Sequence, residues 1–250
     1  MSQHDLQVLI AGAGVGGLAL AQALHHAGIE VRVVERDPSP AIRNQGYRIH
    51  VDHHGNAALR TCLPPEVLAA VQSTSGTNGD LMAVLTPELK PVMEQTFPGL
   101  GEEVITNVDR RAFRRSLLSG IADRVHFGRA LERYRVTDAG RIHARFADGS
   151  EAEADLLVGA DGVGSPVRRQ LLPDAEIRDL GLRCIYGQMP ITEATESLIP
   201  AAFHRGFVWV ADDDGGGVGF APLRFRSRPD LPSRGAGRGL PDGHDAHQRA

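Results

Sequence analysis

The first 35 residues follow the pattern of a strand, a glycine-rich turn, a helix and a second strand. Residues 7–11 form a short apolar run, which is typical of a strand buried on both faces. Residues 18–27 carry apolar side chains at helical spacing and end at Gly28, a common helix stop. Residues 29–35 form another apolar run with charge at its end. The pattern predicts a βαβ unit with parallel strands.

The middle of the chain mixes strand and helix signals. The pattern predicts a strand at 47–51, a helical stretch at 56–72 broken at Pro64-Pro65, and a surface loop at 73–80. Residues 104–107 predict a short strand. Residues 110–122 predict a helix with Asp109 as its N-cap and with one apolar stripe, made of Phe113, Leu117 and Ile121.

The second half of the chain favours β structure. Residues 142–146 alternate apolar and polar and lead into Asp148-Gly149, which predicts a hairpin turn. The return strand continues into an apolar run at 155–160 that ends in Asp161-Gly162. Apolar clusters make residues 182–222 a predicted β-rich region, with one cluster at Ile185-Tyr186. Residues 227–250 contain no aromatic or β-branched residue, so we expect that tail to be disordered.

Composition narrows the function classes. The net charge of -4 argues against a nucleic-acid binder, and no apolar run is long enough for a membrane span. No Lys or Arg precedes residue 6, which argues against a secretory signal, and two distant cysteines suit a reducing cytoplasm. The only lysine, Lys90, precedes a proline, so no Walker A loop exists. No metal-binding motif stands out, and the oligomeric state stays open.

The glycine-rich turn carries the strongest chemical signal. Gly12, Gly14 and Gly17 have the spacing of a dinucleotide-binding turn: the first permits a tight turn, the second lets a pyrophosphate approach, and the third allows close helix packing. The helix N-terminus then stabilises phosphate charge. Glu35 ends the second strand, where its carboxylate is expected to accept hydrogen bonds from ribose hydroxyls. An acid there suits FAD or NAD better than NADP, and this motif alone leaves both open.

A second motif helps to choose between these two cofactors. The apolar strand at 155–160 is followed by Asp161-Gly162, Ser165 and Arg168. Together with the glycine fingerprint, the run through Glu35-Arg36 and the segment 108–113, it resembles the FAD-dependent aromatic hydroxylases. These are the single-component flavoprotein monooxygenases similar to p-hydroxybenzoate hydroxylase. The resemblance covers residues 6 to about 225.

The resemblance implies an α/β fold with a Rossmann-like FAD-binding βαβ domain, a parallel sheet and an antiparallel substrate sheet. It implies a domain at 1–180 (discontinuous in the family), a β-rich substrate region at 181–226 and an aberrant tail at 227–250. The implied cofactor-binding residues are Gly12, Gly14, Gly17, Glu35, Arg36, Arg110, Asp161 and Gly162. The family's third fingerprint, an apolar strand ending in Gly-Asp, has no match, so we expect an incomplete C-terminus.

By resemblance, NAD(P)H reduces the FAD, and one oxygen atom of O2 passes to a small aromatic or polyketide-like substrate. No side chain stands out as a catalytic acid or base, which fits a cofactor that carries the chemistry. One alternative is an FAD- or dinucleotide-binding remnant without turnover. A further alternative is an NAD-linked dehydrogenase, which predicts a catalytic Lys, Tyr-Lys or His-Asp set, and the sequence shows no such set.

Overall fold

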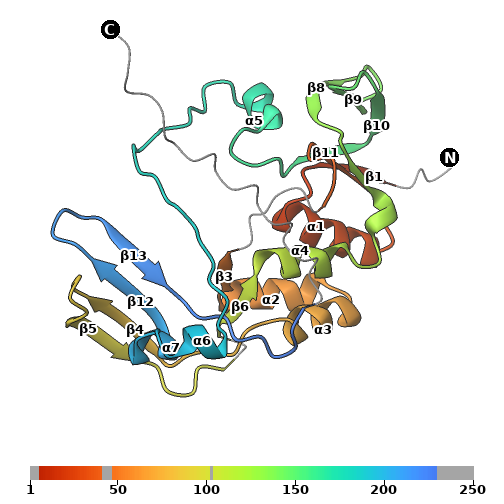
Figure 1. Ribbon diagram of the computed structural model, residues 1–250. Helices are drawn as coiled ribbons and strands as arrows, with labels where there is room; N and C mark the ends of the chain where they lie inside the picture. Colours follow the sequence, from red (N-terminus) through yellow and green to blue (C-terminus); the bar gives the residue numbers. More distant parts are fainter. Residues whose placement is uncertain (1–5, 41–46, 102–103, 230–250) are drawn as a thin grey trace, which may run out of the picture.

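The computed structural model describes residues 6–40, 47–101 and 104–229. A four-stranded parallel sheet lies at its centre, made of β1 (Gln7–Ala11), β2 (Glu30–Glu35), β7 (Val125–Phe127) and β11 (Leu156–Gly159) in the order β11-β1-β2-β7. Helix α1 (Val15–His26) connects β1 to β2 (Figure 1). The predicted βαβ unit is confirmed.

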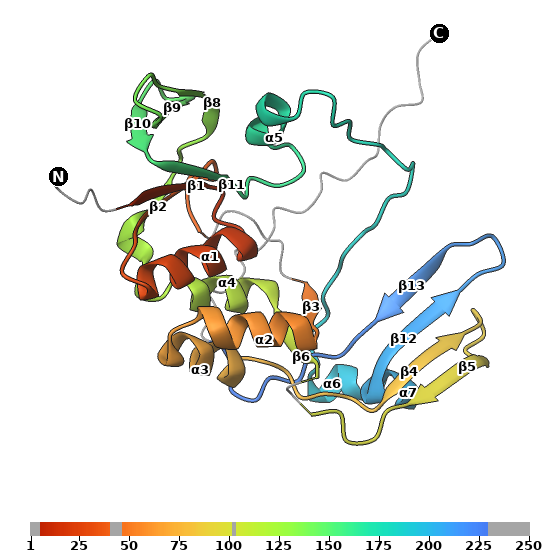
Figure 2. The ribbon, with the colours of Figure 1, turned by 180° about the vertical axis from the view of Figure 1, so that it is seen from behind.

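Each face of this sheet is covered by a different layer. Helix α1 lies on one face with α2 (His53–Cys62), α3 (Pro65–Ser73) and α4 (Arg110–Leu118), and the short 3-10 helix Ala122–Arg124 leads into β7 (Figure 2). In β1, Val8 and Ile10 face these helices, whereas Leu9 and Ala11 face the opposite layer. Burial on both faces is why this strand is a continuous apolar run.

The opposite layer is an antiparallel sheet of β8 (Leu131–Val136), β9 (Ile142–Phe146) and β10 (Glu151–Ala154). The predicted hairpin joins β9 to β10, and Gly149 in its turn has φ 82°. Phe146 is fully buried in a core with Leu9 and Val34 of the parallel sheet. Helix α5 (Pro166–Leu171) follows β11, and Gln170 is hydrogen-bonded to β8.

A two-stranded sheet of β3 (Arg48–Val51) and β6 (Thr106–Asp109) lies beside the helices. Asp109 caps α4 as predicted, and the α-helix ends at Leu118, four residues before the predicted end at 122. The surface loop predicted at 73–80 is wrong in part, because Ser75 is completely buried. Backbone hydrogen bonds from Thr77, Arg226 and Ser227 tie this loop to the later segment 224–227 and satisfy its polar groups.

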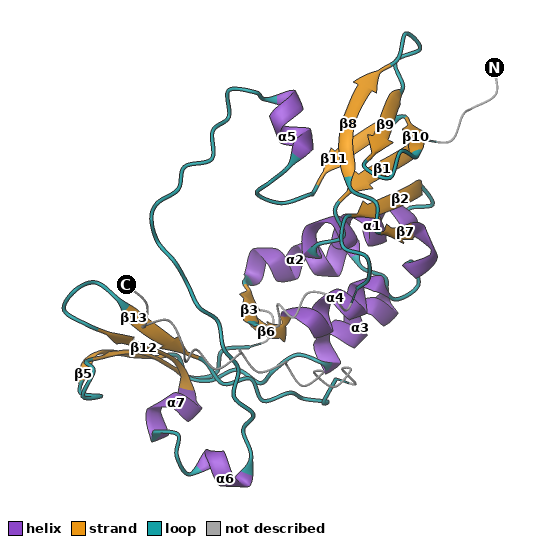
Figure 3. Cartoon of the chain, turned by 45° about the horizontal axis from the view of Figure 1, so that its top comes forward, coloured by secondary structure: helices purple, strands orange, loops and turns teal. Residues whose placement is uncertain are grey.

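A separate four-stranded sheet, here called sheet C, lies apart from the parallel sheet (Figure 3). It contains β4 (Leu81–Leu85), β5 (Pro91–Thr96), β12 (Gly206–Ala211) and β13 (Gly217–Phe220) in the order β13-β12-β4-β5. Two short helices, α6 (Glu193–Glu196) and α7 (Ala201–Arg205), precede β12. Two strands of this sheet thus come from residues 81–96 and two from residues 206–220.

The β-rich prediction for 182–222 holds from residue 206 onward and is wrong before it. Ile185 and Tyr186 lie in no strand, and Ile185 is 98% exposed. Apolar clustering alone does not supply a strand partner, and no strand of the described residues pairs with this segment. The tail predicted to be disordered lies outside the described residues from 230 onward. Within the described ranges, no helix combines the length and apolar character needed to cross a membrane.

We expect Phe146→Ala to lower the free energy of unfolding by about 3–5 kcal/mol, because it leaves a cavity between the parallel sheet and the antiparallel layer. Val136→Ala is the control in the adjacent strand, where the side chain is 63% exposed, and should change stability by less than about 0.5 kcal/mol. Urea denaturation followed by circular dichroism measures both. Equal losses in the two variants would contradict this packing.

Candidate cofactor-binding site

The glycine turn lies at the carboxyl end of β1, against the loop that follows β11. Gly12 has φ 108°, and a Cβ atom there would lie 2.3 Å from the carbonyl oxygen of Ala160. A Cβ atom on Gly17 would lie 2.0 Å from the carbonyl oxygen of Gly12. Both glycines are therefore required by packing, because the opposing atoms are backbone and have little room to move.

Gly14 differs from its two partners. It is the N-cap of α1, in extended conformation, and a Cβ atom added there would meet no heavy atom within 4 Å. The first turn of α1 contains no acidic residue. Unbonded N–H groups at a helix N-terminus next to an open glycine make a cradle for an anionic group. The residues of the turn therefore fit the pyrophosphate of a dinucleotide.

Glu35 has a second role that sequence reasoning did not predict. Its carboxylate is buried, its Oε2 atom accepts a hydrogen bond from the Ala13 N–H at 2.8 Å, and its Oε1 atom accepts one from the Asp37 N–H at 3.0 Å. The carboxylate thus holds the glycine turn in place. Each carboxylate oxygen has a further lone pair, so hydrogen bonds from ribose hydroxyls remain compatible with this arrangement.

Arg114 is a residue of this site that sequence reasoning missed. Its Nε atom donates to the carbonyl oxygen of Ala13 at 2.8 Å, and its Nη1 atom donates to that of Pro40 at 3.1 Å. Its guanidinium lies 5.7 Å from the Phe127 ring centroid. Glu35 and Arg114 therefore bind opposite ends of the same residue, Ala13. No local signal marks Arg114, because it is one of several arginines off the apolar stripe of α4.

Asp161-Gly162 lies beside the glycine turn, because β11 pairs in parallel with β1 and matches Gly159 to Ala11. The Asp161 Oδ2 atom lies 3.5 Å from the Val167 N–H. Its Oδ1 atom is buried and has no hydrogen-bond partner among the described residues. A buried carboxylate oxygen without a donor is costly, and a ligand hydroxyl would satisfy it. Gly162 has φ 79°, a left-handed backbone conformation that glycine adopts readily and that turns the chain directly after Asp161.

The two predicted arginines directly follow β2 and β6. Arg36 is exposed just after β2, and Arg110 begins α4, with its guanidinium 5.7 Å from the Tyr47 ring centroid. Within the described ranges, neither forms a hydrogen bond or ion pair with the glycine turn. Arg48 on β3 was not predicted as a site residue, but its Nε atom is buried without a partner among the described residues, and burial lowers the pKa of its guanidinium.

Comparisons with known proteins agree with this geometry. The FAD binding domain family matches residues 5–53. The chain is 38% identical over 219 residues to the dual O-methyltransferase/FAD-dependent monooxygenase elcB of Phaeosphaeria nodorum, covering 83% of this chain and 23% of that protein. It is 35% identical over 181 residues to the 3-amino-4-hydroxybenzoate 2-monooxygenase of Streptomyces cremeus, covering 70% and 44%.

A solved structure gives the same result. The crystal structure of a Photorhabdus luminescens protein assigned as an FAD-containing monooxygenase matches with a TM-score of 0.71 and 30% identity, over 83% of this chain and 53% of that one. The chain is therefore a relative of the FAD-dependent monooxygenases of the aromatic hydroxylase family and carries their FAD-binding domain. The resemblance found in the sequence motifs is confirmed. The chain spans about half or less of the length of these relatives.

The three glycines should differ in their effect on stability. We expect Gly12→Ala and Gly17→Ala to lower the free energy of unfolding by about 2 kcal/mol or more, because each new methyl group meets backbone atoms. Gly14→Ala should cost at most about 1 kcal/mol, as an N-cap change in open space. Denaturant titration of the three variants measures the order. A loss at Gly14 as large as at Gly17 would contradict the described turn.

Proposed function

We propose that the chain binds FAD with the pyrophosphate over Gly14 at the N-terminus of α1. The observation that carries the proposal is the meeting of three features at one sheet edge: the open glycine turn, the Glu35 carboxylate and the unsatisfied Asp161 oxygen. This edge lies at the carboxyl ends of parallel strands, where open α/β sheets bind ligands. The FAD-binding match over 5–53 supports the same choice of cofactor.

Each site residue then has a defined task. Gly12 and Gly17 shape the turn, and Gly14 leaves room for the phosphates. Glu35 accepts hydrogen bonds from the ribose hydroxyls, and Asp161 with Gly162 faces the polyol or flavin part of the cofactor. Arg36 and Arg110 supply positive charge for the cofactor at the ends of β2 and β6.

We further propose that the chain is the cofactor-binding part of a monooxygenase that hydroxylates an aromatic or polyketide-like small molecule. When bound, FAD would accept a hydride from NAD(P)H and activate O2 for transfer of one oxygen atom. The names of the relatives support this activity, and one of them acts on 3-amino-4-hydroxybenzoate.

The substrate surface, in this proposal, is the face of sheet C that α7 does not cover. Met82, Met93 and Trp209 lie 40%, 44% and 38% exposed on three adjacent strands. The Trp209 ring lies close against β13: a Cβ atom on Gly217 would lie 2.7 Å from the ring, and one on Gly219 would lie 3.2 Å from it. A flat indole beside two flexible thioether side chains suits an aromatic ligand.

A second candidate function is FAD binding without turnover. One observation favours it: β11 is at the edge of the described parallel sheet, none of its residues is buried, and Gly159, at the end of the strand next to the site, is exposed. Parallel sheets are normally covered on both sides, so this edge and the site next to it are less enclosed than a catalytic cofactor site requires.

The test is flavin retention. The purified chain is incubated with FAD, desalted and examined by visible absorbance. We expect the wild type to retain a stoichiometric flavin, and Gly14→Ala to weaken FAD affinity at least about tenfold, which is about 1.4 kcal/mol. Glu35→Gln should weaken it as well, while Glu94→Gln, on the exposed strand β5, is the matched control.

The outcomes separate the candidates. A colourless, folded wild type contradicts FAD binding altogether. Retained flavin with substrate-stimulated oxidation of NADH or NADPH, measured against a panel of phenols, supports the monooxygenase. Retained flavin without such oxidation supports the second candidate.

A further inference from the structure

The segment between α5 and α6, residues 172–192, is here called the connector. It runs without regular structure from the parallel-sheet unit to sheet C (Figures 1 and 3). Much of it is open to solvent: Leu180, Leu182 and Ile185 are 73%, 80% and 98% exposed. A loop of this length within a folded unit is uncommon, and such loops usually have a functional role.

Two connector residues contact the cofactor-binding unit. The Tyr186 ring stacks on the Tyr47 ring, with centroids 4.8 Å apart and an interplanar angle of 22°. The Gln188 Nε2 atom donates to the Asp109 Oδ2 atom at 3.3 Å. In an extended segment, residues two apart share a side, and Ile185 correspondingly faces solvent. One side of the connector is therefore docked.

Both contacts are made at the start of α4. The Asp109 Oδ1 atom accepts hydrogen bonds from the N–H groups of Arg111 and Ala112, which leaves its Oδ2 atom for Gln188. The Tyr47 carbonyl oxygen accepts from the Arg110 N–H at 3.1 Å, and the Arg110 guanidinium lies over the Tyr47 ring. The connector thus contacts Asp109, which precedes Arg110 in the sequence, and Tyr47, which contacts Arg110 in space. Arg110 is a proposed cofactor ligand.

The electrostatics of Tyr186 suit stacking. A hydrogen bond with Cys184, followed by the charge of that thiol when ionised, raises the pKa of Tyr186 above its ordinary value. An ordinary tyrosine is already neutral at physiological pH and the shift keeps it so, which leaves no phenolate charge next to Tyr47.

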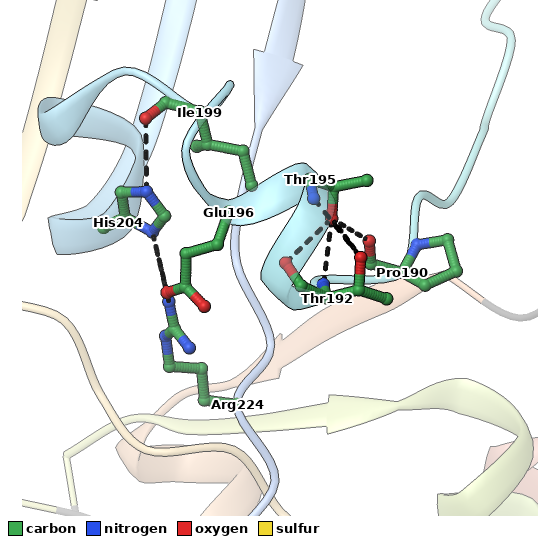
Figure 4. Close-up of polar contacts among 7 residues, drawn as sticks. All are labelled: Pro190, Thr192, Thr195, Glu196, Ile199, His204 and Arg224. Atoms are coloured by element: carbon green, nitrogen blue, oxygen red, sulfur yellow. Dashed lines mark hydrogen bonds and ion pairs between the residues drawn. The ribbon is translucent and has the colours of Figure 1, made fainter.

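The far end of the connector is fastened to the helices that lead into sheet C (Figure 4). The Thr195 hydroxyl donates to the Pro190 carbonyl oxygen at 2.7 Å, and Thr192 and Thr195 form a capping box at α6. Glu196 of α6 forms an ion pair with Arg224.

Arg224 extends this fastening to α7. Its Nη2 atom lies 3.1 Å from the Nδ1 atom of His204, whose Nε2 atom is 3.2 Å from the Ile199 carbonyl oxygen. Helix α7 ends at Arg205, directly before β12, the strand that carries Trp209. The contacts through α6, Arg224 and α7 therefore connect the end of the connector, close to Gln188, to the strand that carries Trp209.

We propose that Tyr186 and Gln188 are positioning residues: they dock the connector on the start of α4 and so set the place of the Trp209 face relative to the cofactor site. The docking of the connector is inferred only from the contacts that Tyr186 and Gln188 make. The link to a cofactor rests on the proposed function, because it uses Arg110 as a cofactor ligand.

Limited trypsin digestion of the chain without cofactor tests the docking. Cleavage after Arg183, three residues before Tyr186, requires the segment to leave its docked position. We expect Tyr186→Ala and Gln188→Ala to be cut there about three to ten times faster than wild type, the factor that corresponds to a lost aromatic stack for Tyr186 and to a lost hydrogen bond for Gln188. Ile185→Ala, on the exposed side, is the matched control and should be cut at the wild-type rate.

Two further measurements distinguish undocking of the connector from unfolding of the whole protein. Cleavage after Arg60 in α2 should stay unchanged in every variant, and Tyr186→Phe, which keeps the ring, should behave as wild type at Arg183. Wild-type rates in both alanine variants would overturn the docking. Faster cleavage at Arg60 as well as at Arg183 would also overturn it, since the residues would then support the fold as a whole.

The link to the cofactor is read from Trp209, the only tryptophan. Bound flavin quenches nearby indole emission, so we expect FAD to quench Trp209 in the wild type, and Tyr186→Ala to reduce that quenching at saturating FAD while affinity is unchanged. Equal quenching in both proteins would overturn the positioning role. If the wild type binds no FAD, the proposed function fails, and the trypsin result alone decides whether the connector docks.

Discussion

The close approach of Gly12 to the peptide that joins Ala160 to Asp161 is the constraint on which the cofactor site depends. It brings the end of β1 against the end of β11, two strands separated by most of the chain. A side chain at Gly12 would not fit between them, so the turn after β1 and the Asp161 loop lie side by side and form two walls of the proposed site. The same close packing allows α1 to begin at Val15, because Gly17 lies against the backbone of Gly12.

The backbone groups of Ala13 link the glycine turn to β2 and to α4. The N–H of Ala13 is bound by Glu35 from the end of β2, and its carbonyl oxygen is bound by Arg114 from α4. Because α4 starts at Asp109 and Arg110, the helix that steadies the glycine turn also receives the connector. Helix α4 therefore contacts the glycine turn through Arg114 at its middle and the connector at its start. In the proposed positioning role, α4 is the element that links the two.

Local patterns predicted the elements whose burial is set by near neighbours. The βαβ unit, the capped helix at Asp109 and the hairpin at Asp148-Gly149 each depend on residues within a few turns of one another, and all three are confirmed. The glycine spacing likewise predicted its own turn. The cofactor-binding role of all eight proposed residues, Arg36 and Arg110 included, stays a prediction.

What escaped prediction depends on contacts between distant segments. Ser75 is buried because residues 224–227 return to cover it, and β4 finds its partner in β12 some 120 residues later. Ile185 and Tyr186 have the composition of a strand but no partner strand. Arg114 is equivalent to its neighbours in sequence, and only the packing of α4 against the turn selects it.

Hydrogen–deuterium exchange with and without FAD tests the central claim most directly, because it locates the cofactor without relying on turnover. We expect FAD to slow exchange in two peptides, one containing residues 12–17 and one containing residues 160–164, with no matching change in β4 or β5. Slowed exchange confined to sheet C, or none in either peptide despite bound flavin, would contradict it.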